Sequence, residues 1–133
     1  MLNSFKELTV WQNAYRLALE VYRITCAFPS SEQYGLASQM KRASVSIPSN
    51  IAEGYKRQSR KEYLQFLSIA SGSAGELETQ LLLSGDLGFL DIEDFQRVSK
   101  LSEEVSKGLG NLIKALKSPR SPNPKPQTPN PPK

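Results

Sequence analysis

The sequence predicts an all-α protein, an antiparallel up-down-up-down four-helix bundle whose second helix is kinked at Pro48. Apolar residues recur at three- and four-residue spacing in four separate segments. Apolar and polar residues do not alternate with a period of two over any useful length, so no strand is expected. Because the predicted connections are short, about four to eight residues, consecutive helices should run in opposite directions.

The first helix is expected at about residues 9–28. Its apolar positions begin at Val10 and end at Phe28. Thr9 is placed to act as its N-cap, and Pro29 follows the last turn.

The second helix is expected at about residues 35–54 and contains Pro48. Its apolar positions project within an arc of roughly 80°, and they are Leu36, Met40, Ala43, Ile47, Ile51 and Gly54. Because Ile51 keeps the register of Leu36 across Pro48, one kinked helix explains the pattern better than two. A proline there costs on the order of 3 kcal/mol if nothing compensates. Gly54 is expected to end the helix.

The third and fourth helices are expected at about residues 60–85 and 92–117. Ser59 and Glu62 match a capping box at the start of the third helix. Gly85 or Gly88 is suited to the left-handed residue that closes it. Asp91 is placed to cap the fourth helix.

Residues 1–117 therefore form one expected domain, and residues 118–133 form a proline-rich tail that holds seven of the nine prolines. The tail has no large apolar side chain, so it is expected to be disordered with polyproline II character. It serves either as a solubilising tail or as a ligand for a proline-reading domain.

Charge is segregated along the chain although the formal net charge is only +4. Three of the 17 cations lie in the tail, which leaves 14 cations against 13 acids in the predicted bundle. Residues 41–61 carry six cations and one acid, whereas residues 76–104 carry eight acids and two cations. A local field of this kind matters more to a polyanion than the net charge does.

The composition argues against an enzyme. The chain has no histidine, which removes histidine-based acid–base catalysis and Glu-x-x-His metal ligands. Its single cysteine, Cys26, excludes an internal disulfide and a cysteine-rich zinc site. We expect no metal, no cofactor and no catalytic residue. Without a secretory signal or a membrane-spanning run, the expected location is the cytoplasm.

A basic cluster at the junction of the second and third helices is the best candidate binding site. It consists of Lys56, Arg57, Arg60 and Lys61, and Lys41 and Arg42 would assist if they are exposed. Tyr55 and Tyr63 flank the cluster and are placed to stack on an unpaired base. The alternative is a junction that is merely solvated.

A polar stripe beside the apolar arc of the second helix is the second candidate. Its six members are Gln39, Arg42, Ser46, Ser49, Asn50 and Glu53. It is either a solvated face or a polar seam between helices or subunits. In a seam, Arg42 would pair with a carboxylate, and Glu78 is the candidate.

Four stretches resemble a bacterial four-helix-bundle family whose founding members are encoded in intervening sequences of large-subunit ribosomal RNA genes. They are FKELTVWQNA (5–14), YGLASQMKRA (34–43), SIPSNIAEG (46–54) and SIASGSAGELETQL (68–81). The resemblance covers roughly residues 5–117 and implies a homopentameric ring. The family is similar to accessory proteins of diversity-generating retroelements, which implies a basic surface that engages nucleic acid and a reverse transcriptase.

The sequence thus predicts a non-enzymatic, self-assembling helical bundle that binds RNA or DNA through the basic junction. Its expected partners are further copies of itself and a nucleic acid, not a membrane. The alternative is a structural or protein-interaction module without a nucleic-acid role.

Overall fold

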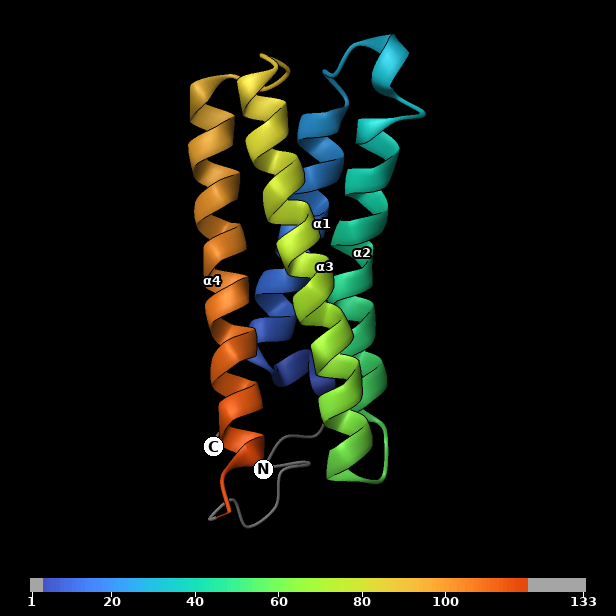
Figure 1. The fold of residues 1–133 in the computed structure, drawn as a ribbon, viewed down its shortest axis with the longest axis vertical. Coiled ribbons are helices and arrows are strands. Elements are labelled where there is room, and N and C mark those ends of the chain that lie inside the picture. Colours follow the sequence, from blue (N-terminus) through green and yellow to red (C-terminus); the bar gives the residue numbers. More distant parts are fainter. Residues whose placement is uncertain (1–3, 120–133) are drawn as a thin grey trace.

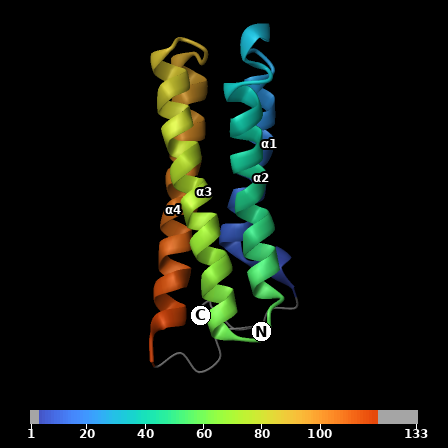
Figure 2. The same ribbon diagram turned by 45° about the vertical axis from the view of Figure 1, so that its right-hand side comes forward.

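The computed structural model describes residues 4–119. Over that range the chain forms the helices α1 (Thr9–Thr25), α2 (Leu36–Tyr55), α3 (Arg60–Asp86) and α4 (Ile92–Lys117), with two short 3-10 helices, η1 (Phe5–Glu7) and η2 (Ser30–Glu32), and no strand. The four long helices lie side by side (Figures 1 and 2), so the predicted all-α, four-helix fold is confirmed. Residues 120–133 of the predicted tail lie outside the described residues.

The colours in Figure 1 place the two ends of the bundle. The turn between α2 and α3 lies at the same end as η1 and the last turn of α4. The turn between α3 and α4 lies at the opposite end, together with η2. Each long helix contacts two others: α2 packs on α1 and α3, and α4 packs on α1 and α3.

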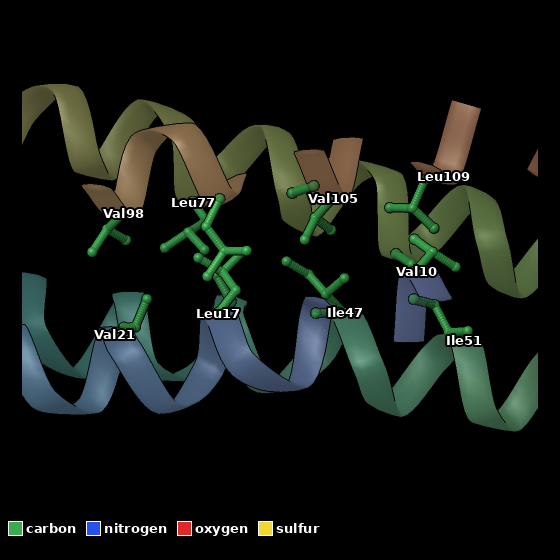
Figure 3. Close-up of a cluster of buried hydrophobic side chains, with 14 of the residues drawn as sticks. Val10, Leu17, Val21, Ile47, Ile51, Leu77, Val98, Val105 and Leu109 are labelled. Carbon is green, nitrogen blue, oxygen red and sulfur yellow. The ribbon is translucent and has the colours of Figure 1, made fainter. Parts of the chain in front are cut away.

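The core fills the space between the four helices along their whole length. Apolar side chains from all four helices meet there in successive layers, as Figure 3 shows for Leu17, Ile47, Leu77 and Val105. All four of these side chains have a relative exposure of 0%. Burying each such side chain contributes about 1.5–3 kcal/mol, which makes this core the main stabilising element.

Helix α2 continues through Pro48, whose side chain is buried. Two nearby side chains bond to the backbone around it: Ser44 Oγ donates to the carbonyl of Lys41 at 2.9 Å, and Asn50 Nδ2 donates to that of Ser46 at 2.8 Å. The passage of one helix through the proline follows from the apolar register described above. The kink itself stays a prediction.

The prediction that Gly54 ends the second helix is wrong. Helix α2 reaches Tyr55, and Gly54 is buried inside it. A Cβ atom built on Gly54 would lie 2.8 Å from Phe66 Cβ and 3.0 Å from Tyr63 Cδ1. Gly54 is therefore needed because α2 approaches α3 so closely at this point, not because the backbone must turn.

The ends of α1 also differ from the prediction. The N-cap is Leu8 rather than Thr9, which is the first helical residue. The helix stops at Thr25 instead of residue 28, because the next amides turn back more tightly. Cys26 N–H bonds to the carbonyl of Arg23, and Phe28 N–H bonds to that of Thr25.

The predicted caps of α3 and α4 are confirmed. Ser59 Oγ accepts from the Glu62 amide at 3.1 Å, and Asp91 Oδ1 accepts from the Asp94 amide at 2.8 Å. Gly88 has φ of 80° and follows the last residues of α3. The amide of Phe89 then bonds back to the carbonyl of Ser84 at 2.9 Å, which completes a Schellman-type end.

Gly54→Ala should destabilise the protein, because the added methyl group would overlap Phe66 at the α2–α3 contact. We expect the free energy of unfolding in urea to fall by about 1–3 kcal/mol. Gly72→Ala is the matched control, since a Cβ there meets nothing within 4 Å on the exposed side of α3. The control should be neutral or stabilising by about 0.5–1 kcal/mol. Equal losses in the two variants would contradict the close-approach explanation.

Candidate nucleic-acid interface

The end of the bundle that holds the α2–α3 turn is rich in cations. The terminal turns and loops at this end carry Lys6, Lys56, Arg57, Arg60, Lys61, Lys114 and Lys117. The carboxylates there are Glu7, Glu53 and Glu62. Cations from η1 and from the end of α4 thus lie near the predicted basic cluster. These segments are far apart in the sequence, so the sequence alone did not group them.

The opposite end is acidic. Its terminal turns and loops carry the acids Glu32, Asp86, Asp91, Glu93 and Asp94 and the cation Arg23, and Glu20 lies in the turn before the last of α1. Glu20 Oε1 lies 2.7 Å from Arg23 Nη2 and 2.9 Å from Arg97 Nη2, and Asp94 Oδ1 lies 2.9 Å from Arg97 Nη2. Arg23 and Arg97 therefore form ion pairs within the chain. The acids still outnumber the cations at this end, so the charge remains separated along the bundle.

Lys56 and Lys61 present the most accessible charges of the predicted cluster. Both side chains are exposed. Lys56 is the C-cap of α2, and its Nζ lies 5.7 Å from the ring centroid of Phe5 in η1. Lys61 lies in the first turn of α3. Both ammonium groups can reach a phosphate outside the bundle.

The two arginines of the cluster are more enclosed. Arg57 Nη2 lies 2.7 Å from Glu53 Oε2, and the guanidinium carbon lies 4.8 Å from the ring centroid of Phe66. Arg57 and Arg60 are both half-buried. Arg57 thus packs against α3 beside the turn, whereas the two lysines carry the exposed charge.

The expectation that Tyr63 stacks on a base is wrong. Tyr63 is 1% exposed and belongs to the core, and burial raises the pKa of its phenol above the usual range. Tyr55 is half-buried and meets Tyr63 edge-on, with 6.1 Å between ring centroids. Burial, and then the charge of Glu7, raise the pKa of Tyr55. The ring of Tyr63 therefore supports the fold, whereas the stacking of a base on Tyr55 stays a prediction.

Part of the predicted polar seam links α2 to α3. Ser46 Oγ and Ser73 Oγ form a hydrogen bond of 2.8 Å between the two helices. Asn50 Nδ2 donates to Ser46 Oγ at 3.0 Å as well as to the Ser46 carbonyl. These three side chains form a polar link inside one chain.

The other members of the stripe do not join this link. Gln39 and Glu53 are exposed, and Glu53 pairs with Arg57. Arg42 donates to Ser38 Oγ at 3.2 Å and lines a groove together with Tyr22 of α1. Within residues 4–119 it therefore forms no ion pair with Glu78, which lies on α3. A pairing of Arg42 with Glu78 between subunits stays a prediction.

The groove of about 580 Å³ between α1 and α2 is a feature that sequence reasoning missed. Its lining includes Tyr22, Tyr34, Lys41 and Arg42. Tyr22 lies at helical spacing from the exposed Tyr15 and Leu19. That second, outward apolar stripe on α1 is the signal that could have indicated it.

Neither a metal centre nor a membrane span is found in the described part of the chain. No group of three or more His, Cys, Asp or Glu side chains among residues 4–119 is arranged to hold a metal ion. Over the same residues, none of the helices has the length and apolarity needed to cross a membrane.

Comparison with known proteins shows similarity to a family and to a solved structure. The family model for 23S rRNA-intervening sequence proteins matches residues 6–111. A crystal structure from Bacteroides thetaiotaomicron, described as a protein with unknown function from the S23 ribosomal protein family, is 25% identical and superposes with a TM-score of 0.73. The match covers 79% of this chain and 95% of that one. No curated protein matches the sequence.

Removing the Ser46–Ser73 bond should loosen the α2–α3 contact. Ser46→Ala and Ser73→Ala should each lower the free energy of unfolding by about 0.5–1.5 kcal/mol. Because the two hydroxyls bond each other, the double variant should lose less than the sum of the single losses. Ser71→Ala, on the exposed side of α3, is the control and should have little effect. Strictly additive losses would show that the two hydroxyls do not interact.

Proposed function

Because the chain belongs to the 23S rRNA-intervening sequence protein family, we propose that it is a non-enzymatic protein that binds RNA or DNA through the basic end of its bundle. The observation that carries this proposal is the exposure of Lys56 and Lys61 in a cluster of cations from three parts of the chain. A phosphate backbone is the polyanion that such a cluster fits best.

In this proposal the phosphate contacts are made chiefly by Lys56 and Lys61. Arg57 and Arg60 add positive potential, and Arg57 orients the turn through its pair with Glu53. Contacts of this type are independent of base sequence. The basic end would therefore supply affinity and salt dependence rather than sequence specificity.

The protein is further proposed to act as a homo-oligomer, with the up-down-up-down chain order, the bend at Pro48 and the pentameric ring that the resemblance implies. Large apolar side chains exposed near the α3–α4 turn support self-association; they are Leu82, Leu83, Leu87 and Ile92. A ring would repeat the basic end several times, and weak phosphate contacts would add by avidity. The proposed location is the bacterial cytoplasm.

A protein-interaction module without a nucleic-acid role is the second candidate. The same exposed apolar side chains favour it, since such patches mark protein contacts. The two candidates differ in what the lysines at the α2–α3 turn do. Only the first requires them.

Reversing the two exposed charges tests the first candidate. The double variant Lys56→Glu and Lys61→Glu should bind RNA and DNA at least about tenfold more weakly at low salt. The slope of log affinity against log salt should fall by about two, one for each lost phosphate contact. Fluorescence anisotropy between about 50 and 200 mM salt measures both quantities.

Lys100→Glu together with Lys107→Glu is the matched control, because it makes the same charge change on exposed positions of α4. The control should retain most of the affinity. Equal losses in the two double variants, or no binding by the wild type at low salt, would contradict a nucleic-acid site at the α2–α3 turn.

Measuring the mass of the protein in solution tests the proposed assembly. Sedimentation or native mass spectrometry at micromolar concentration should show an oligomer, with five copies as the expected number. A monomer under these conditions would contradict both the ring and the use of the exposed apolar side chains for self-association.

A further inference from the structure

We propose that the groove between α1 and α2 binds an unpaired nucleotide of the strand that the basic end holds, an inference that rests on the proposed function. The groove has a volume of about 580 Å³. The residues that carry the argument are Tyr22, Tyr34, Lys41 and Arg42. None of the four belongs to the α2–α3 turn.

The groove supplies the aromatic surface that the basic turn lacks. Tyr34 precedes α2 and is 97% exposed, so nearly the whole ring faces solvent. Tyr22 on α1 is 47% exposed. A base can stack on such a ring whatever its identity, because every base has a π-face. At the α2–α3 turn, by contrast, Tyr63 is buried and Tyr55 is half-buried.

The charges in the groove suit a phosphate. Arg42 is exposed and donates one bond, from Nη1 to Ser38 Oγ. A guanidinium has five N–H donors in a planar fork, so further donors remain for a bidentate phosphate contact. Lys41 Nζ lies 5.3 Å from the ring centroid of Tyr22 and adds a second positive charge. The described residues that line the groove include no carboxylate.

The groove and the basic turn are connected along one face of α2. Arg42, Ser49 and Lys56 are spaced seven residues apart, which returns each to nearly the same side of the helix, and all three are exposed. Arg42 and Lys56 are separated by about 21 Å at 1.5 Å per residue. Figure 1 shows α2 as one helix between the two places. A single strand lying along this face would meet cations at both ends.

This arrangement selects single-stranded nucleic acid. In a duplex the bases are stacked on each other, and their faces are closed to a tyrosine ring. The turn lysines need only phosphates and would accept either form. The groove therefore adds affinity for an unpaired strand alone.

The test compares a 12-nucleotide single-stranded RNA or DNA probe with a duplex of the same sequence, a length within the roughly 4–16 nucleotides that small single-strand sites cover. Tyr34→Ala should weaken binding of the single strand about tenfold and leave duplex binding unchanged. Arg42→Ala should weaken single-strand binding in the same direction. Tyr15→Ala is the matched control, because Tyr15 is 51% exposed on α1 but does not line the groove.

Three outcomes would overturn the proposal, and the first two leave the proposed function standing. If Tyr34→Ala binds the single strand as tightly as the wild type while Lys56→Glu/Lys61→Glu loses binding, the groove is not a binding site and the basic turn is. If Tyr34→Ala weakens single-strand and duplex binding equally, the groove does not select an unpaired nucleotide. Absence of any binding by the wild type would remove both sites.

Discussion

The close contact between α2 and α3 is the constraint on which the rest of the structure depends. At Gly54 the two helices approach so closely that a single methyl group would overlap Phe66. Further along, two of the smallest polar side chains, Ser46 and Ser73, meet directly. Because α2 and α3 are in contact close to the end of the bundle where the chain passes from one to the other, a short turn joins them. The cations on either side of that turn are consequently close together, and Lys56 and Lys61 among them are exposed.

Periodicity predicted the fold well because it reports which side of a helix faces the core. It placed four helices and carried α2 through Pro48, and the local signals at Ser59 and Asp91 identified the N-caps of α3 and α4. Gly54 was misread because a glycine near a helix end suits either a turn or a close approach. Only the position of α3 decides between them.

The binding surfaces were less predictable for the same reason. Tyr63 heads the apolar series of α3, and that spacing was the better guide to its buried position than its place beside the cations. The α1–α2 groove depends on a loop that sets Tyr34 near Arg42 and Tyr22, a proximity that no local pattern encodes. Likewise, Lys6 and Lys117 join the basic end only through the path of the chain.

The separation of charge along the bundle has a consequence for how the protein would meet a charged molecule. The 27 residues of α3 span about 40 Å. Electrostatic screening in physiological salt acts over only about 8 Å, so an approaching molecule senses one end of the bundle at a time. A polyanion would be drawn first to the basic end, where the α2–α3 turn lies, before any contact forms. Orientation would thus be settled during the encounter, and added salt would slow association by removing this guidance.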